Sequence, residues 1–232
     1  MGSAWLPATL LGRLDHATLD RLFALGVRRS VDSCQTIIRE GADESYVVLL
    51  DDGLAKVTAV MDDGRQALLA IRVSGDVIGE MSALNGLPRS ATVTACRRSV
   101  IRIIHRAEFR GFLRSYPDVA MELAGIVADR LRWANRRRVD FATYPVKVRL
   151  ARVLWEIASL YGRRVPAGIV VDIRLTQAEL ATMCGAAEIS LHKALRELRD
   201  AHVVETGYRA VTVRDADALR LAAEARATDD PV

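Results

Sequence analysis

Residues 75–95 read GDVIGEMSALNGLPRSATVTA, and this stretch carries the strongest functional signal in the chain. A glycine before a short helix exposes backbone N–H groups to an anion, and Gly79 stands in that position. Arg89, ten residues later, can add a charge-assisted fork to the oxygens of the same anion. Glu80 offers only acceptor atoms, which suit the hydroxyl groups of a ribose. The pattern therefore predicts a cradle for a sugar-linked phosphate.

Short β segments surround this cradle. The expected strands cover residues 36–38, 46–50, 54–60, 67–73, 91–95 and 100–104, with turn residues such as Asp51-Asp52-Gly53 between them. Strands at this spacing predict an all-β barrel or sandwich. A helix that Asp15 caps and Gly26 ends comes before the strands.

After residue 104 the apolar period becomes that of a helix. A short helix is expected at residues 107–114, and a long one from Pro117 to about Tyr144. The long helix carries two adjacent apolar stripes: Ala120, Leu123, Val127 and Ala134 form one, and Met121, Ala124, Ala128 and Leu131 form the other. One stripe can pack on the chain's own barrel and the other on a twin helix, which predicts a coiled-coil dimer. The alternative is a helix buried within one chain.

The C-terminal part has the pattern of a winged helix-turn-helix. Thr176 and Glu179 have the spacing of a capping box, and Gly185 supplies the tight turn between two helices. The second of these helices covers about residues 187–200 and buries either Ile189 or Leu191. An Arg-rich link and a strand at residues 169–173 come before them, and a hairpin through Gly207-Tyr208 follows as a wing. Tyr208 and Arg209 lie in this hairpin.

Composition is typical of a globular protein and excludes several classes. The chain has 232 residues, of which 50% are hydrophobic and 27% charged, so disorder and fibrous folds are excluded. No apolar stretch approaches the roughly 20 residues that cross a bilayer, and the N-terminal residues lack a basic segment leading into an apolar one, so we do not expect export. Three scattered cysteines predict neither disulfides nor a zinc ribbon, so we expect a soluble protein of the reducing cytoplasm. The net charge of +4 is weak support for an anionic partner.

The segment from Gly79-Glu80 to Arg89-Ser90-Ala91-Thr92-Val93 resembles the phosphate-binding cassette of cyclic-nucleotide-binding domains. Together with the C-terminal module, residues 8–215 resemble a transcription regulator of the cyclic AMP receptor protein and fumarate-nitrate regulator (Crp/Fnr) superfamily. The resemblance implies an α+β chain in three parts: a cyclic-nucleotide-binding β-barrel of jelly-roll type (1–116), a long dimerisation helix (117–144) and a winged helix-turn-helix (145–232). It implies a homodimer on a palindromic site in double-stranded DNA, with RNA polymerase as a further partner and no membrane.

The same resemblance assigns ligand-binding roles. Gly79 and Ser90 would meet a cyclic phosphate, Arg89 would pair with its charge, and Glu80 would take the ribose 2′-hydroxyl. The full expected set is Gly79, Glu80, Met81, Arg89, Ser90, Arg130, Ala134 and Asn135. Relatives place two polar residues at the last two positions, and Ala134 lacks the usual hydroxyl, a loss of about 1 kcal/mol.

The resemblance makes cyclic AMP the expected effector, the missing hydroxyl at Ala134 counts against it, and three alternatives stay open. They are another cyclic nucleotide, an unrelated ligand, or no ligand, with the barrel kept only as a dimerisation scaffold. In the last case Arg89 and Glu80 would form a mutual salt bridge. Trp133, beside Ala134, would pack on the barrel, on a ligand or on the second subunit.

The resemblance implies that the second helix of the C-terminal pair reads DNA in the major groove, and Tyr208 and Arg209 of the wing are expected to contact DNA as well. The expected DNA-binding residues are Thr176, Gln177, Ala187, Glu188, Ser190, His192, Lys193 and Arg196. Glu188 replaces the arginine that relatives use first, and Ile189 replaces their glutamate. We therefore expect an operator different from the TGTGA type.

Catalysis is not expected, since the chain has no HExxH, P-loop or Gly-x-Ser-x-Gly motif. An iron-sulfur cluster needs about four suitably placed thiolates, and the chain has three scattered cysteines. Its four histidines are not grouped like haem or metal ligands. We therefore expect no metal, no required cofactor and no catalytic residue.

Overall fold

The computed structural model describes residues 5–171, 173–207 and 210–225. It has two compact units, residues 1–132 and 133–232, which are described separately. Within the described ranges, no helix is both long enough and apolar enough to cross a membrane.

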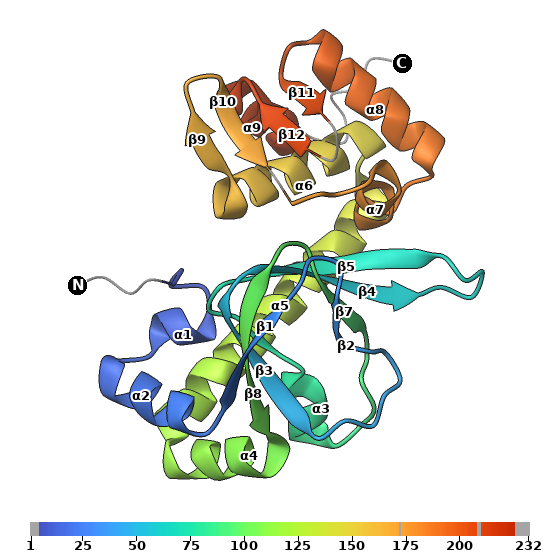
Figure 1. Cartoon of the computed structure of the whole chain (residues 1–232). Helices are drawn as coiled ribbons and strands as arrows, with labels where there is room; N and C mark the ends of the chain where they lie inside the picture. Colours follow the sequence, from blue (N-terminus) through green and yellow to red (C-terminus); the bar gives the residue numbers. More distant parts are fainter. Residues whose placement is uncertain (1–4, 172, 208–209, 226–232) are drawn as a thin grey trace. The chain divides into compact units, whose positions relative to one another are not determined.

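The N-terminal unit is built on two four-stranded antiparallel sheets (Figure 1). One has the order β1-β8-β3-β6 and the other β2-β7-β4-β5, so the chain passes back and forth between the two sheets. The strands are β1 (Val27–Val31), β2 (Thr36–Ile38), β3 (Tyr46–Asp52), β4 (Leu54–Val60), β5 (Gln66–Val73), β6 (Val77–Ile78), β7 (Thr92–Ala95) and β8 (Ser99–His105). This arrangement confirms the jelly roll, as two sheets rather than one closed barrel.

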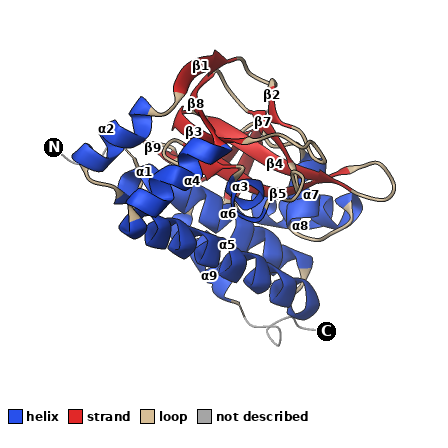
Figure 2. Cartoon of the chain, turned by 90° about the horizontal axis from the view of Figure 1, so that it is seen from below, coloured by secondary structure: helices blue, strands red, loops and turns tan. Residues whose placement is uncertain are grey.

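Strand β3 is buried on both faces and joins two cores. Because successive side chains on a strand point to opposite faces, Val47 and Leu49 face one core and Val48 and Leu50 the other. The second core lies between the sheets. The first is shared with five helices of this unit: α1 (Leu10–Arg13), α2 (His16–Ala24), α3 (Glu80–Asn85), α4 (Arg106–Ser115) and α5 (Pro117–Thr143). Figure 2 shows α4 and α5 on one side of the strands.

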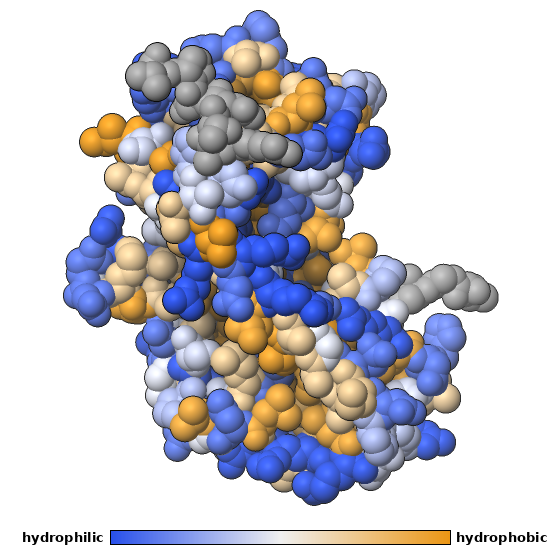
Figure 3. Space-filling model, turned by 180° about the vertical axis from the view of Figure 1, so that it is seen from behind, coloured by the Kyte–Doolittle hydropathy of each residue, from blue (hydrophilic) through white to orange (hydrophobic). Residues whose placement is uncertain are grey.

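Helix α5 buries one stripe and exposes another. Val119, Leu123 and Ile126 lie in the core, so Leu123 is the one residue of the first predicted stripe that is buried. Met121 and Leu131 of the second predicted stripe are 71% and 60% exposed. Ala124 and Ala128, on the same stripe as these two, are not buried either. Figure 3, the reverse of Figure 1, shows apolar side chains on the surface of the N-terminal unit. An apolar stripe that stays exposed in a single chain supports the expected twin helix.

The C-terminal unit contains the last part of α5, from Trp133 on, and a winged helix-turn-helix. Its other elements are α6 (Val146–Tyr161), β9 (Arg163–Val165), β10 (Gly168–Val171), α7 (Gln177–Met183), α8 (Glu188–Asp200), β11 (Val204–Gly207), β12 (Ala210–Val213) and α9 (Ala216–Glu224). The strands form one antiparallel sheet in the order β11-β12-β10-β9. Both hydrogen bonds of the predicted capping box between Thr176 and Glu179 are present.

Several short elements were not predicted. The residues expected to form an Arg-rich link include β9, whose three residues pair with β10 at the edge of the sheet. A three-residue strand at the edge of a sheet is stabilised mainly by its pairing with β10. Its own sequence has no apolar–polar alternation from which the strand could be predicted. The sequence also missed α1, β1, β6 and α9. Tyr208 and Arg209, expected in the wing, lie outside the described residues.

The sequence left open whether α8 buries Ile189 or Leu191, and the structure decides between them. Leu191 is fully buried and Ile189 is 84% exposed. We predict that Leu191→Ala lowers the free energy of unfolding by about 2–5 kcal/mol, because it leaves a cavity. Ile189→Ala should change it by less than about 0.5 kcal/mol. Urea unfolding of both variants checks this, and equal losses would contradict the packing of α8.

Thiol reactivity offers a second check. Cys34 is exposed, whereas Cys96 and Cys184 are buried, and burial raises the pKa of Cys184 to about 12. Because the thiolate is the reactive form, we predict that an aromatic disulfide reagent modifies only Cys34 in the native protein and all three cysteines in denaturant. Cys34→Ser should leave the native protein unreactive, and rapid modification of that variant would argue against the described burial.

Candidate functional site

A small cavity in the N-terminal unit brings together six of the expected ligand-binding residues. Its wall includes Gly79, Glu80, Met81, Arg89, Ser90 and Arg130. The remaining lining residues are Ile38, Val57, Arg72, Ile78, Ser82, Ala91 and Val93. The cavity therefore lies among β2, β4, β5, β6, β7, α3 and α5. Segments far apart in sequence meet there because the jelly roll folds the cassette back onto its own strands.

Gly79 cannot be replaced by another residue without strain. Its φ of +78° lies in the left-handed region, and a Cβ atom would come within 2.4 Å of Arg89 Nη1. The backbone carbonyl of Gly79 accepts a hydrogen bond from that nitrogen at 2.9 Å. The glycine therefore makes room for the arginine at the cavity wall.

Arg89 is a buried cation that keeps one unused donor. Its guanidinium group donates to the carbonyl oxygens of Gly79 and Tyr46 and stacks 4.9 Å from the centre of the Tyr46 ring. The Glu44 carboxylate is 3.9 Å from Nε, which is buried without a hydrogen-bond partner among the described residues. Burial lowers the pKa of Arg89. An anion bound in the cavity would stabilise the charge of this group.

Arg130 forms an ion-pair cluster at the cavity wall. It donates to Glu80 Oε1 at 2.7 Å, to Asp76 Oδ1 at 3.0 Å and to the Val77 carbonyl oxygen at 3.1 Å. Burial tends to lower the pKa of Arg130, but attraction to Glu80 and Asp76 outweighs it, so the pKa is raised. The salt bridge considered between Arg89 and Glu80 is not formed, since the direct partner of Glu80 is Arg130. This contact ties α5 to the cassette.

The cavity is small in this state. It measures about 80 Å³, below the roughly 300–1,000 Å³ of small-molecule sites. Arg130 lies in its wall and occupies the Glu80 carboxylate that a ribose hydroxyl would use. A sugar phosphate would therefore have to displace or share this contact.

Ala134 and Asn135 are not part of the cavity wall. Both are positions of α5 that belong to the C-terminal unit, and both are exposed. Trp133 contacts residues of its own unit: its indole nitrogen donates to Glu156 of α6, and Arg137 stacks 4.3 Å from its ring centre. The Trp133 ring therefore packs inside its own unit.

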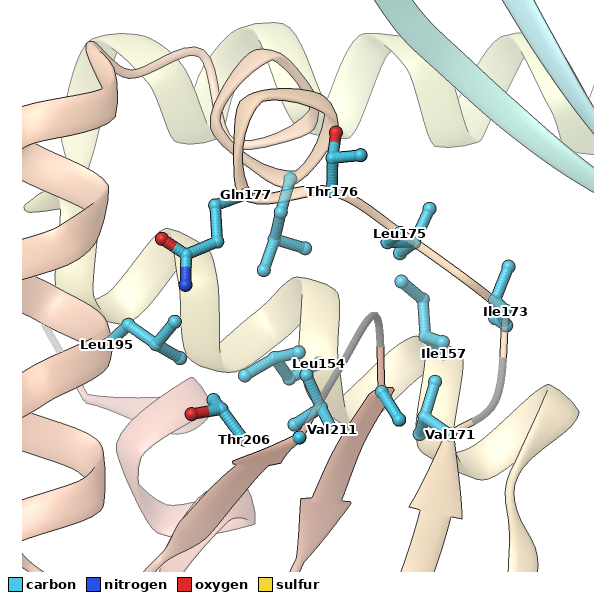
Figure 4. A pocket seen from close by; sticks show the side chains of 13 residues that line it. Leu154, Ile157, Val171, Ile173, Leu175, Thr176, Gln177, Leu195, Thr206 and Val211 are labelled. Carbon is cyan, nitrogen blue, oxygen red and sulfur yellow. The ribbon is translucent and has the colours of Figure 1, made fainter.

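The expected DNA-reading surface is exposed and polar. The expected residues at α8 are all exposed: Ala187, at the N-cap, and Glu188, Ser190, His192, Lys193 and Arg196. Thr176 is half-buried, and its hydroxyl serves the capping box of α7. Gln177 is exposed, and Figure 4 shows its amide turned toward a neighbouring cavity. Six of the eight expected residues thus lie on the accessible first part of one helix.

That neighbouring cavity is an apolar gap inside the winged helix. It measures about 220 Å³ and lies between α6, β10, α7, α8 and the β11–β12 hairpin. Leu154, Ile157 and Leu195 surround it in Figure 4. Its wall contains no charged residue among those described, so it offers no counterpart to the anion cradle.

Two arginines donate hydrogen bonds to the turn between α7 and α8. The turn was predicted from the sequence, but these contacts were not. Arg137 of α5 donates to the Met183 carbonyl oxygen, and Arg149 of α6 donates to those of Cys184 and Gly185 at 2.9 Å each. Five arginines lie close together along α5, and they divide into two groups: Arg130, Arg132, Arg136, Arg137 and Arg138. Arg130 and Arg137 make internal contacts, whereas the side chains of Arg132, Arg136 and Arg138 lie on the surface.

The possible metal ligands of the described residues are not gathered at one place. Among those residues, no group of three or more His, Cys, Asp or Glu side chains is placed to hold a metal ion.

The Arg130 cluster can be tested by stability. Arg130→Gln would leave Asp76 and Glu80 buried without their cation, so we predict a loss of about 3–5 kcal/mol in the free energy of unfolding. The matched control is Arg132→Gln, whose side chain is 72% exposed and pairs with Asp129 on the surface. That change should cost less than about 1 kcal/mol. Similar losses in both variants, measured by urea unfolding, would refute the structural role of Arg130.

Comparison with known proteins gives two family matches. Residues 28–116 match the cyclic nucleotide-binding domain, and residues 148–222 match the Crp-like helix-turn-helix domain. The first match contains the whole cassette, and the second contains α7, α8 and the wing.

Relatives with similar sequences cover most of the chain. The CRP-like cAMP-activated global transcriptional regulator of Mycobacterium tuberculosis is 27% identical over 191 residues, 82% of this chain and 84% of the relative. The anaerobic regulatory protein of Bacillus subtilis is 24% identical over 184 residues, 79% of this chain and 77% of the relative.

Among solved structures, the c-di-GMP responsive global regulator CLP of Xanthomonas campestris has a TM-score of 0.75 at 19% identity, covering 86% of this chain and 99% of that one. A CRP-family transcriptional regulator of Thermus thermophilus has a TM-score of 0.71 at 24% identity, covering 87% and 100%. Both share the fold. With a cyclic nucleotide-binding domain followed by a Crp-like helix-turn-helix, the chain belongs to the Crp/Fnr superfamily of DNA-binding transcription regulators.

Proposed function

We propose that this regulator is a homodimer whose affinity for DNA is set by a cyclic nucleotide, cyclic AMP first, bound in the cavity of the N-terminal unit. The relative from Mycobacterium tuberculosis is cAMP-activated, and the chain matches the cyclic nucleotide-binding domain. Gly79, Ser90 and Arg89 would hold the phosphate, and Glu80 and Arg130 would meet the ribose. Asn135 would be offered to the base, beside Ala134.

One observation carries this proposal: Arg89 is a buried cation in the wall of the cassette cavity, and its Nε has no hydrogen-bond partner among the described residues, although the Glu44 carboxylate lies 3.9 Å away. A buried unpaired donor costs free energy unless a ligand satisfies it. A cyclic phosphate matches that donor in charge and in hydrogen-bonding capacity.

The contact between Arg130 and Glu80 suggests how the ligand acts. A ribose hydroxyl would compete with Arg130 for the Glu80 carboxylate, and Arg130 is a residue of α5. A ligand shifts a conformational equilibrium only by binding one arrangement better than the other, typically by about 1–3 kcal/mol. We therefore infer that binding changes how the two α5 helices of the dimer pack, and with it the spacing of the two α8 helices.

The three parts of the chain would then have separate roles. Residues 1–116 would bind the effector together with Arg130 and Asn135, residues 117–144 would form the dimer, and residues 145–232 would bind a palindromic operator through α8. We further propose that the protein acts in the cytoplasm, contacts RNA polymerase at its promoters and has no catalytic activity.

A second candidate function is that of a regulator that binds DNA without a ligand. The small cavity, the occupied Glu80 and the missing hydroxyl at Ala134 favour it. In that case the jelly roll serves only as a scaffold for the dimer.

The test measures DNA affinity with and without nucleotides. Labelled duplexes selected from a random pool are titrated with the protein, alone and with cyclic AMP or cyclic GMP, and fluorescence anisotropy is recorded. We predict that cyclic AMP tightens binding to a palindromic duplex at least tenfold, which is about 1.4 kcal/mol. Arg89→Gln should abolish this gain.

Arg97→Gln is the matched control, because Arg97 pairs with Asp52 on the surface of the same unit. It should keep the full gain. Equal affinity in all three conditions would overturn cyclic-nucleotide control and favour the scaffold function. Absence of any bound duplex would overturn the DNA-binding role itself.

A further inference from the structure

Ile189 is the most exposed of the large apolar side chains that the structure describes. It lies in the first turn of α8 and is 84% exposed. Leu191, two positions later, is fully buried and anchors the helix. Ile189 therefore contributes little to the packing of the C-terminal unit, and its apolar surface is open to a partner.

Ile189 lies at the centre of the outer face of α8. The inner face is formed by Leu191, Ala194, Leu195 and Leu198, all buried. With about 3.6 residues per turn, Ile189, Lys193 and Arg196 lie above one another on the opposite face. Both of these later residues are exposed. Ile189 thus stands in the middle of the surface that α8 would present to DNA.

The neighbours of Ile189 favour DNA over a protein as the occupant of this face. Lys193 and Arg196 are cations, and Ser190 and His192 are exposed polar residues beside them. An apolar protein surface would leave these cations without anions, whereas a DNA duplex supplies phosphates along each groove. The chain also belongs to a superfamily of DNA-binding regulators through a domain that contains α8.

The chemistry of the isoleucine side chain limits what it can read. It has neither a donor nor an acceptor, so it cannot recognise a base through hydrogen bonds. In the major groove the one apolar group on a base edge is the 5-methyl group of thymine. An aliphatic side chain at the groove floor gains free energy by covering that methyl and loses it beside a polar edge that it leaves unpaired.

We propose that Ile189 is a specificity-determining residue of this regulator and that it recognises the 5-methyl group of a thymine in each half of the operator. The inference rests on the proposed binding of an operator through α8, and it is independent of the effector. Ile189 was not among the residues expected to contact DNA. It adds an apolar contact to a surface whose expected contacts are otherwise almost all polar.

Deoxyuridine isolates this contact, because it differs from thymidine only by the missing methyl group and keeps the same base pairing. The selected palindromic duplex is prepared with each thymine replaced by deoxyuridine in turn, at the equivalent position of both half-sites. Each duplex is titrated with the full-length protein, with and without saturating cyclic AMP, and fluorescence anisotropy gives the affinity. The variants are Ile189→Ala, Ile189→Val and Leu221→Ala.

We expect one thymine position at which loss of the two methyl groups weakens binding of the wild-type protein at least fivefold. Ile189→Ala should bind the thymine duplex more weakly and reduce the thymine-to-uracil ratio at that position to less than twofold. Ile189→Val, which keeps a branched side chain, should retain part of the ratio. Leu221→Ala should leave it unchanged, because Leu221 is 63% exposed on α9, which packs on α6 and is not part of the α7–α8 pair.

Two results would overturn the inference. The first would leave the proposed DNA binding standing, and the second would overturn it too. If a duplex is bound but no thymine position is sensitive to deoxyuridine, or if Ile189→Ala keeps the wild-type ratio, Ile189 does not read a methyl group and DNA binding stands. If the folded protein binds no duplex in any condition, the DNA-binding role fails as well. Urea unfolding verifies that each variant is folded.

Discussion

The guanidinium group of Arg130 sits between two buried carboxylates, Asp76 and Glu80, and much of the cassette is arranged around this contact. Asp76 also accepts a hydrogen bond from the Val73 backbone N–H, so the same carboxylate fixes the turn before the cassette. Glu80 begins α3 and faces the cavity. Removing the arginine would leave buried charge without its partner, which costs several kcal/mol. The cluster therefore joins a turn, a ligand residue and the long helix in one energetic unit.

Much of this architecture could be predicted from local sequence patterns. Turn residues and short apolar runs predicted the longer strands, because turn chemistry and alternation are properties of a few neighbouring residues. The capping box of Thr176 and Glu179 was predicted for the same reason. The cassette residues were found through a resemblance that depends on spacing, and six of the expected ligand residues do line one cavity.

The features that were missed depend on partners far apart in sequence. The resemblance assigned Arg130 to a ligand, but only the fold shows that it pairs with Glu80 and that Arg137 binds the Met183 carbonyl oxygen. Arg149 binds carbonyl oxygens 35 and 36 residues away, and no periodicity reveals such a pair. Ile189 could be assigned to the inner or the outer face of α8 from periodicity, and the packing of Leu191 decides between them.

The arginines at the turn between α7 and α8 bind main-chain oxygens and not side chains. A carbonyl oxygen is present whatever residue carries it, so this attachment does not constrain the identity of the residues on the outer face of α8. Substitutions at Glu188, Ser190 or Lys193 can then accumulate while the helix keeps its place. A lineage could thus acquire new operator preferences through drift on one exposed surface, without a compensating change in the scaffold beneath it.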